Sequence, residues 1–394
     1  MINFNYHTPT EVVFGKQSED STASLIKKYN GTNVLIHYGG KSAIKLGLIE
    51  KITQQLNNNE IKYTLLGGVV PNPRLSLVKK GIEICQTNKI DFILAIGGGS
   101  VIDSSKAIAY GLKYKGDVWD LFCGKAQATD TTPVGAILTI PAAGSEMSDS
   151  CVITNENGNF KRGYNNTICR CKFAIMNPEF TFTLPEYQTA CGATDIMMHT
   201  MERYFSPDTD MPLTDAIAEG LLKTVKNSTL EIIKNPNNYQ HRAQIMWASS
   251  LSHNDLTGCG MTRDFATHKL EHELSAMFDV AHGAGLAALW PSWARYTMRC
   301  NISRFVQFAV NVMGVTNDFS NPEKTALQGI EAMENFYHTI KMPTNLQDLI
   351  GRKLTQTEIT TMAEKCSLGQ KTTIGSFKKL NYNDMLNIYN AANE

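Results

Sequence analysis

The strongest constraint on the fold is a repeated alternation of short apolar runs and amphipathic segments in the first half of the chain. The apolar runs are almost continuous, which is typical of strands buried on both faces of a parallel sheet. Amphipathic helical patterns between them indicate strand–helix–strand units. We predict an α/β domain with a Rossmann-like parallel sheet. Its strands are expected at 33–40, 62–68, 91–99 and 133–144, and its helices at 42–58, 75–89 and 101–114.

A less regular part follows, with a hairpin turn at 154–159 and a returning strand at 171–178. Strand-like runs then become scarce after Leu184 and Pro185, and long amphipathic helical patterns dominate. The length of 394 residues suits two domains. We predict an α/β domain over 1–184 and an all-α domain over 185–394.

The predicted strand at 91–99 runs directly into three glycines and then a helix. Gly97, Gly98 and Gly99 allow a sharp bend and a close approach to a pyrophosphate. We expect Ser100 to cap the helix and Asp103 to complete an S-x-x-D capping box. The helix N-terminus would then face the phosphates. The motif is neither G-x-G-x-x-G nor a P-loop, and a purely structural glycine turn is the alternative.

A second glycine turn, Gly39-Gly40-Lys41-Ser42, ends the strand predicted at 33–40. In many nicotinamide enzymes an acidic residue after such a strand binds the ribose hydroxyl, and this turn has none. Lys41 and Ser42 could instead meet a 2′-phosphate, which favours NADP(H) over NAD(H). The alternative for Lys41 is a solvated surface side chain.

Four residues in the second half resemble a complete ligand set for one metal ion. Asp195 and His199 are four apart in a helical pattern, so both project from one helix face. His268 and His282 lie in a histidine-rich stretch with apolar neighbours. One carboxylate and three imidazoles suit Fe²⁺ or Zn²⁺ with room for a substrate oxygen. The alternative is that these histidines are packed or solvated.

A rival interpretation uses the same stretch. His268, Glu271 and His272 match H-x-x-E-H, the inverted zinc-peptidase pattern, in which Glu271 would be the general base. This zinc metallopeptidase hypothesis leaves the glycine turns and the Asp195–His199 pair without a role. Replacing Glu271 should separate a peptidase from a nicotinamide-dependent enzyme: the peptidase should lose its activity, whereas hydride transfer to or from the nicotinamide should survive the change. A third hypothesis is a non-catalytic nucleotide-binding protein with structural histidines.

Composition narrows the partners and the compartment. The 37 basic and 37 acidic residues balance, which favours neither nucleic acid nor a membrane surface as a partner. No signal peptide and no apolar run of membrane-spanning length is visible. The nine cysteines are irregularly spaced, so we expect free thiols and a cytoplasmic location.

Taken together, these segments resemble the iron-containing (group III) alcohol dehydrogenase family. The resemblance is closest to its butanol dehydrogenase and NADPH-dependent aldehyde reductase branch, and it covers nearly the whole chain in order. It is carried by VVFGK, AIGGGSVIDSSKA, LTIPAAGSEMS and, most specifically, THKLEHELSAMFDVAHGAGLA. The family fold implied is a dinucleotide-binding α/β domain followed by a helical metal domain.

The resemblance also implies an activity and its residues. The activity is hydride transfer between NADP(H) and a primary alcohol or aldehyde, in a homodimer joined through the N-terminal region, where 11–15 could form an edge strand. The implied metal ligands are Asp195, His199, His268 and His282, and we assign His272 a proton-relay role beside them. The implied cofactor contacts are Gly39, Gly40, Asn72, Gly97, Gly98, Gly99, Ser100, Asp103, Thr139, Ser148 and Lys161.

Overall fold

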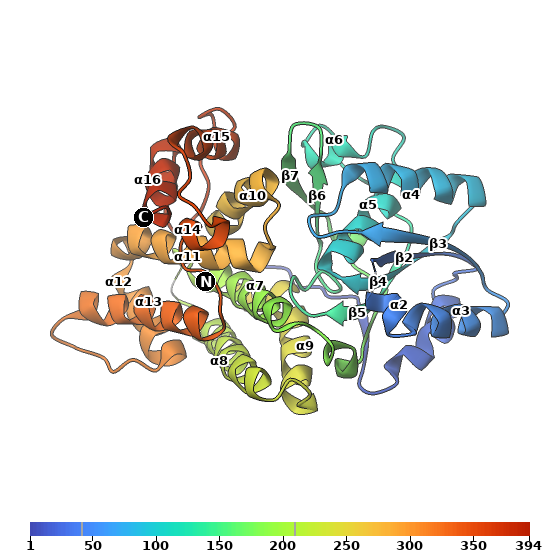
Figure 1. The fold of residues 1–394 in the computed structure, drawn as a ribbon, viewed down its shortest axis with the longest axis horizontal. Coiled ribbons are helices and arrows are strands. Elements are labelled where there is room, and N and C mark those ends of the chain that lie inside the picture. Colours follow the sequence, from blue (N-terminus) through green and yellow to red (C-terminus); the bar gives the residue numbers. More distant parts are fainter. Residues whose placement is uncertain (41, 209) are drawn as a thin grey trace. The chain divides into compact units, whose positions relative to one another are not determined.

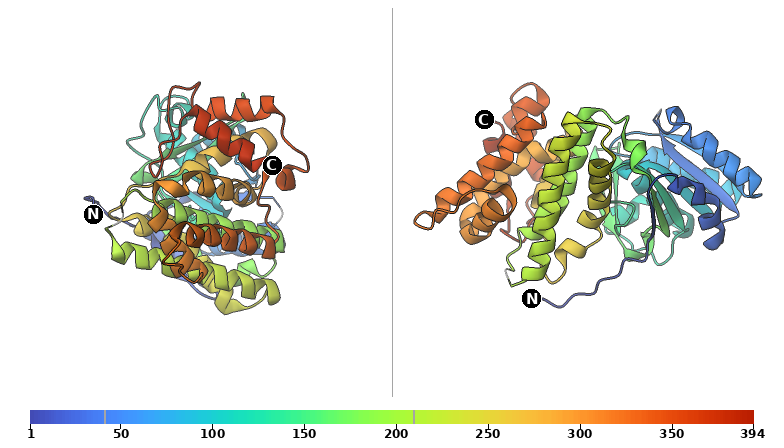
Figure 2. Two further views of the ribbon diagram at one scale, coloured as in Figure 1. Left: turned by 90° about the vertical axis from the view of Figure 1, so that its left-hand side faces the viewer. Right: turned by 90° about the horizontal axis from the view of Figure 1, so that it is seen from below.

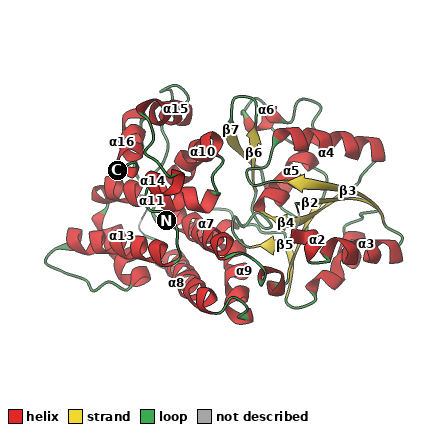
Figure 3. Cartoon of the chain, in the orientation of Figure 1, coloured by secondary structure: helices red, strands yellow, loops and turns green. Residues whose placement is uncertain are grey.

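The computed structural model describes residues 1–40, 42–208 and 210–394, and the chain divides into two compact units. The α/β unit spans His7–Leu184, and the helical unit comprises Pro185–Glu394 together with Met1–Tyr6. Figure 3 shows the strands gathered in the α/β unit. The described part of the helical unit contributes only an isolated bridge between Ile374 and Leu380.

A parallel sheet forms the centre of the α/β unit. Six described strands lie in the order β1-β8-β5-β4-β2-β3, and every neighbouring pair is parallel. These strands are β1 (Glu11–Phe14), β2 (Asn33–Gly39), β3 (Lys62–Val69), β4 (Phe92–Gly98), β5 (Val134–Ile140) and β8 (Phe173–Met176). The helices are α1 (Thr22–Lys28), α2 (Ser42–Lys45), α3 (Leu48–Asn58), α4 (Leu75–Asn88), α5 (Gly99–Lys113) and α6 (Trp119–Phe122), with 3₁₀ turns at Ser18–Ser21, Thr167–Cys169 and Pro178–Thr181.

Helices cover both faces of this sheet, which confirms the predicted fold class (Figure 1). Side chains alternate along a strand, so neighbouring residues of β2 face opposite sides. Val34 and Ile36 join α1 and α3 in one apolar cluster. His37 faces the other side, where its Nε2 lies 2.8 Å from Ser104 Oγ on α5. Helix α4 packs against α5 on that side.

The strand order fixes where a ligand can bind to the sheet. Strand β3 pairs with one edge of β2, and the next strand along the chain, β4, pairs with the other edge. Strands β5 and β8 then extend the sheet outward from β4. The switch point lies between β2 and β4. In open α/β sheets, ligands bind beyond the carboxyl ends of the strands at such a point. Strand β2 ends at Gly39 and β4 at Gly98, so both predicted glycine turns lie there.

A hairpin extends from the sheet where the sequence predicted a turn. Strands β6 (Ser150–Asn155) and β7 (Phe160–Asn165) pair antiparallel. The N–H of Thr154 donates to Pro73 O at 2.8 Å, which ties the hairpin to the loop after β3. Thr154 in turn lies opposite Lys161.

The helical unit packs around one large apolar cluster. Helices α7, α8 and α9 lie side by side, as Figures 1 and 2 show. Helix α10 packs against α11, which also contacts α7 and α16. The helices are α7 (Glu186–Tyr204), α8 (Pro212–Lys234), α9 (Tyr239–His253), α10 (Ala266–Phe278), α11 (His282–Thr297), α12 (Ile302–Phe308), α13 (Pro322–Thr339), α14 (Leu346–Ile350), α15 (Gln356–Cys366) and α16 (Tyr382–Ala392), with 3₁₀ turns at Leu256–Gly258 and Met298–Cys300 and a π-helical turn at Ala309–Met313. Among the described residues, no helix combines the length and apolar character needed to cross a bilayer.

Two local predictions were wrong. The helix expected over 42–58 is divided into α2 and α3, because Gly47 takes the left-handed conformation at φ +65°. The capping box of Ser100 and Asp103 is absent: α5 already begins at Gly99, and its N-cap, Gly98, has no side chain with which to cap it. Asp103 instead accepts hydrogen bonds from other segments, described below.

Candidate functional site

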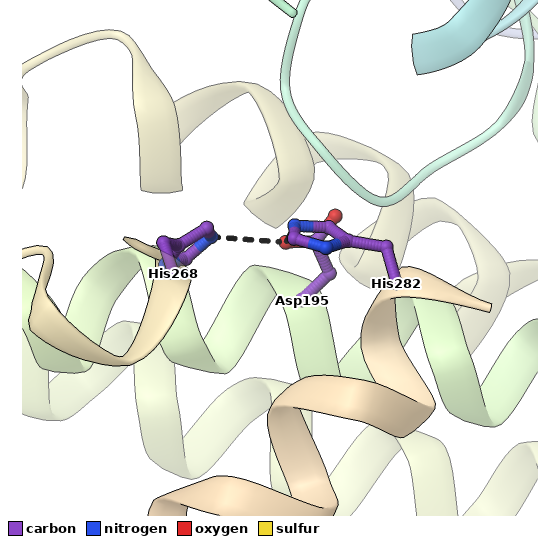
Figure 4. Close-up of side chains that lie close together, drawn as sticks. All are labelled: Asp195, His268 and His282. Carbon is purple, nitrogen blue, oxygen red and sulfur yellow. Dashed lines mark ion pairs between the residues drawn. The ribbon is translucent and has the colours of Figure 1, made fainter. Parts of the chain in front are cut away.

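Three helices of the helical unit bring the predicted ligands together. Asp195 lies on α7, His268 on α10, and His282 is the first residue of α11. Figure 4 shows the three side chains close together, with a dashed line from His268 to Asp195. His268 Nε2 lies 3.6 Å from Asp195 Oδ1, and His282 Nε2 lies 3.8 Å from the same oxygen. One potential ligand atom from each of the three residues falls within 4.8 Å of the others.

His199 lies beside this group on the same face of α7 as Asp195. Its Nδ1 is 3.0 Å from Asp195 Oδ1 and 3.0 Å from the Asp195 carbonyl oxygen. Its ring centroid lies 4.4 Å from that of His268. The fourth predicted ligand is therefore next to the other three, and its coordination of a metal stays a prediction.

Small residues at the start of α11 allow this convergence. A Cβ on Gly283 would lie 2.1 Å from the carbonyl oxygen of Cys191 on α7. A Cβ on Gly285 would lie 2.9 Å from the Glu271 side chain on α10. Any larger residue at either position would push α11 away from its neighbours. The sequence His-Gly-Ala-Gly thus places His282 close to both helices.

The donor set fits a divalent cation. Asp195 Oδ1 and His268 Nε2 are buried, and among the described residues neither has a hydrogen bond of good geometry, although His199 and His268 lie close enough to the carboxylate to form ion pairs with it. Leaving such a group unsatisfied costs about 1–3 kcal/mol. A carboxylate oxygen and imidazole nitrogens are ligands that Fe²⁺ and Zn²⁺ accept. A cation between these atoms would satisfy both of them.

Two buried glutamates orient the histidines. Glu202 on α7 pairs with His268 Nδ1, and its other oxygen accepts the His268 backbone N–H at 3.1 Å. Glu271 on α10 pairs with His282 Nδ1 and also accepts a hydrogen bond from Ser275 Oγ. A proton held on each Nδ1 leaves Nε2 as the free electron pair, directed toward Asp195. Carboxylate–histidine pairs of this kind fix the ring and raise its basicity as a ligand.

The electrostatics of the cluster favour positive charge at its centre. Burial acts to raise the pKa of Asp195, but His199 and His282 outweigh it and hold that pKa well below its usual range. Burial acts to lower the pKa of His268, yet Glu202 and Asp195 raise it to about 9. The carboxylate is therefore ionised, and His268 Nε2 draws a proton in the place where a metal would bind.

His272 occupies a more open position one helical turn beyond His268. It is half-buried, and its ring centroid lies 6.0 Å from that of His282. It belongs to a second group, Glu271, His272 and His282, whose potential ligand atoms also lie within 4.8 Å of one another. The described residues contain no such group that joins His268 to His272. The zinc-peptidase interpretation needs both on one metal.

Glu271 also differs from the role that either hypothesis gave it. It is fully buried and bonded to His282 and Ser275, so it is poorly placed to activate water. The structure equally revises the expectation that Glu271 can be replaced without effect on hydride transfer, because His282 depends on it.

Sequence reasoning missed two residues of this cluster, Glu202 and His253, and gave a third, Glu271, the wrong role. Glu202 lies three residues after His199, which places both on one helix face and could have indicated it. Glu271 was noticed only as part of a peptidase pattern. His253 closes the cluster at the end of α9, with its buried ring centroid 3.9 Å from that of His199. No sequence pattern indicates His253, because α9 and α7 meet only in the fold.

The predicted phosphate turn is held tight by side chains around it. A Cβ on Gly97 would lie 2.4 Å from Val101, one on Gly98 would lie 3.0 Å from Ile140, and one on Gly99 would lie 2.9 Å from Ala143. Only glycine therefore allows the backbone to pass from β4 into α5 at this distance from β5. Ser100 lies in the first turn of α5.

The other predicted cofactor residues fall into two groups. Gly39 ends β2, Gly40 and Ser42 come after it, and Asn72 follows β3 with φ +54°. These residues lie at the carboxyl edge, together with the buried Thr139 near the end of β5. Lys41 lies outside the described residues.

The second group is turned into the protein. Ser148 Oγ accepts the Ser150 N–H at 3.2 Å. Asp103 accepts hydrogen bonds from Ser145 Oγ at 2.6 Å and the Val152 N–H at 3.0 Å. Lys161 is buried on β7.

Comparisons with known proteins agree with this arrangement. Residues 9–178 match the family model described as iron-containing alcohol dehydrogenase, and residues 189–393 match that of the Fe-containing alcohol dehydrogenase family, C-terminal. The chain is 41% identical over 391 residues to NADH-dependent butanol dehydrogenase A of Clostridium acetobutylicum, covering 99% of both chains. It is 33% identical over 351 residues to the NADPH-dependent aldehyde reductase YqhD of Escherichia coli, covering 88% and 89%. The crystal structure of NADH-dependent butanol dehydrogenase A from Thermotoga maritima superposes with a TM-score of 0.96 at 34% identity, covering 100% and 99%.

We predict that Glu271→Gln and Glu202→Gln each weaken metal binding by about 10- to 100-fold, because a neutral amide no longer raises the basicity of the paired histidine. Competition with a chelator of known affinity measures this. Glu331→Gln removes the same charge from an exposed position on α13 and should change nothing. Unaltered affinity in both buried variants would contradict the role of these carboxylates.

Proposed function

Because the chain belongs to the iron-containing alcohol dehydrogenase family, we propose that it transfers a hydride between NADP(H) and a primary alcohol or its aldehyde. The family makes it a metal-dependent alcohol or aldehyde oxidoreductase that uses a nicotinamide cofactor. The observation that carries the proposal is the convergence of His268 and His282 on Asp195, with buried ligand atoms left unsatisfied. Butanol-type alcohols and a broad range of aldehydes are the proposed substrates, since relatives bear these names.

The residues divide the work as follows. Asp195, His199, His268 and His282 would hold one Fe²⁺ or Zn²⁺, which when bound would polarise the substrate oxygen. Zinc binds more tightly than iron at such sites, so availability decides which is loaded. Glu202 and Glu271 fix the ring orientations of His268 and His282. The turns Gly39–Gly40 and Gly97–Ser100, with Asn72 and Thr139, would hold the cofactor. Ser148, Asp103 and Lys161, which are turned into the protein, would contribute to the cofactor site from behind these turns.

His272 is the proposed proton relay. It lies beyond the group around Asp195 and is half-buried, so its ring can exchange protons with water. Its neighbours in the second group, Glu271 and His282, are polar. Imidazole side chains are the commonest proton donors and acceptors in catalysis. We therefore assign His272 to protonation of the product oxygen rather than to metal binding.

We expect Asp195→Ala and His268→Ala to lose metal and turnover together, because each removes a ligand. His272→Ala should keep its metal while kcat falls about 10²- to 10⁴-fold, the usual contribution of a positioned acid or base. Absorbance of NADPH during aldehyde reduction, with metal analysis on the same samples, gives both values. His338→Ala, at an exposed site on α13, is the control.

Two outcomes would contradict the function. Metal-replete wild-type protein that oxidises neither NADPH nor NADH with short or long aldehydes is not this enzyme, and cofactor binding without turnover would favour the non-catalytic hypothesis. Peptide hydrolysis lost in Glu271→Gln would instead favour the metallopeptidase.

The preference for NADP(H) is proposed from the turn after β2. Four relatives are named as NADH-dependent, one as NADPH-dependent and one as NADP-dependent, so the relatives do not decide it. The turn Gly39–Ser42 offers no carboxylate that would repel a 2′-phosphate, and Lys41 supplies positive charge.

We predict that the wild-type protein has a higher kcat/KM with NADPH than with NADH. Lys41→Ala should lower the NADPH value about tenfold, the worth of one charged hydrogen bond, and leave the NADH value unchanged. Steady-state rates with both cofactors measure this. Lys80→Ala, an exposed lysine on α4, serves as the control. Equal losses with both cofactors would contradict 2′-phosphate binding by Lys41.

We further propose a homodimer in the cytoplasm. Strand β1 lies at one edge of the sheet, with β8 as its neighbour, and an exposed edge can pair with a second chain. Sedimentation equilibrium should give twice the chain mass, and a monomer would contradict the proposal. All nine cysteines lie in the described residues and none is paired in a disulfide, which agrees with the proposed reducing compartment. Recovery of the native protein from a secreted fraction would contradict the location.

A further inference from the structure

Lys106 is a fully buried ammonium to which the proposed chemistry gives no role. It lies on α5, and its exposed fraction is 0%. Its Nζ donates to the carbonyl oxygens of Ser145 at 2.7 Å, Ser148 at 2.9 Å and Ser150 at 2.9 Å. Nζ also lies 3.4 Å from Ser148 Oγ. An ammonium has three N–H donors, so three carbonyls of one short segment satisfy it.

This arrangement makes the shape of segment 145–150 depend on a cation. Carbonyl oxygens carry partial negative charge, and three of them converge on one point only when a positive group stands there. Burying an ammonium is unfavourable unless hydrogen bonds compensate for the lost water. An apolar side chain of the same length would fill the space without that cost, but it would leave the three carbonyls unpaired.

Asp103 holds the same segment from the previous turn of α5. Its carboxylate accepts hydrogen bonds from Ser145 Oγ and from the Val152 N–H, and its carbonyl oxygen accepts one from Cys151 Sγ at 3.1 Å. One face of α5 thus binds carbonyl oxygens of the segment through Lys106, and binds the Ser145 hydroxyl and the N–H of Val152, just beyond the segment, through Asp103. The segment is held to α5 at both of its ends.

Segment 145–150 follows β5 and lies beside the predicted phosphate turn. The chain between β5 and this segment passes close to that turn, since a Cβ on Gly99 would lie 2.9 Å from the Cβ of Ala143. In a planar trans peptide the N–H points opposite to the C=O. Because the carbonyls of Ser145 and Ser148 are turned toward Lys106, the next N–H groups, those of Glu146 and Asp149, are directed away from α5.

We propose that Lys106 is a positioning residue for the nicotinamide nucleotide. By gathering the carbonyls of 145–150, it sets the orientation of the backbone N–H groups beside the phosphate turn and so the affinity for the cofactor. The inference rests on the proposed function, since it takes this segment as part of the cofactor site. It touches neither metal ligands nor His272, so its effects should be confined to cofactor binding.

The test replaces Lys106 with Met, which keeps the length and removes the charge and the donors. We expect the Kd for NADPH or NADH, measured by quenching of protein fluorescence, to rise about 10- to 100-fold, as for loss of charged hydrogen bonds. The KM for the cofactor should rise with it. kcat at saturating cofactor and bound metal per chain should stay within about twofold of wild type by the same reasoning.

Lys226→Met is the matched control. Lys226 on α8 also donates from Nζ to a backbone carbonyl, that of Val312 at 2.8 Å, but in the helical unit. It should lower the melting temperature without changing the cofactor Kd. If Lys106→Met does not fold, Lys106→Gln, which keeps an N–H donor, replaces it and should give a smaller rise in Kd.

Three results separate the hypotheses. A cofactor Kd in the Lys106 variant equal to that of wild type or of Lys226→Met overturns the inference. Parallel losses of kcat, metal and cofactor affinity also overturn it, because they indicate a general structural role. Wild-type protein that binds no nicotinamide nucleotide refutes the proposed function itself, a failure distinct from that of the inference.

Discussion

The burial of the Asp195 carboxylate is the constraint on which the helical unit depends. An ionised carboxylate inside an apolar core is unfavourable unless it is paired and hydrogen-bonded. Here the charge is surrounded by imidazoles from α7, α10 and α11, two of which are bonded in turn to the buried carboxylates Glu202 and Glu271. These contacts determine how closely the three helices approach. Glycine at positions 283 and 285 is a consequence of that demand rather than an independent feature.

In both units several electron-rich atoms converge on one point that favours a positive charge, but the two units use different groups to build that point. In the helical unit, side chains supply the negative atoms, and their electron pairs converge where a cation would satisfy them. In the α/β unit, the backbone supplies them, and the Lys106 ammonium is the positive centre. In each case oxygen or nitrogen atoms that would otherwise repel one another are fixed in a single arrangement. Rigid groups of this kind can recognise a ligand without reorganising when it binds.

Much of the architecture could be predicted from the sequence because its signals are local. Near-continuous apolar runs reveal strands buried on both faces, and glycines mark the turns after β2 and β4. The i, i+4 spacing of Asp195 and His199 predicted their contact for the same reason. The predicted capping box is absent because the Asp103 carboxylate accepts hydrogen bonds from Ser145 and Val152, which lie far from α5 in the sequence.

The residues that were missed depend on contacts between distant segments. His253 meets His199 only because α9 packs on α7, and no spacing in the sequence records that packing. Lys106 likewise resembles an ordinary helical lysine until β6 and the preceding loop fold around it.

The H-x-x-E-H pattern illustrates how one motif can serve a different chemistry. On α10 the spacing places Glu271 one helical turn from His268 and beside His272, as a peptidase would need. Which side chains converge on one metal site, however, is decided by the segments that pack against α10. His282 enters from α11, and Gly285 makes room for Glu271 to bond to it. The glutamate thereby becomes the support of a histidine from another helix, and His272 is left outside the Asp195 group. The H-x-x-E-H spacing reflects the periodicity of a helix. The packing of α11 against α10 determines what His268, Glu271 and His272 do.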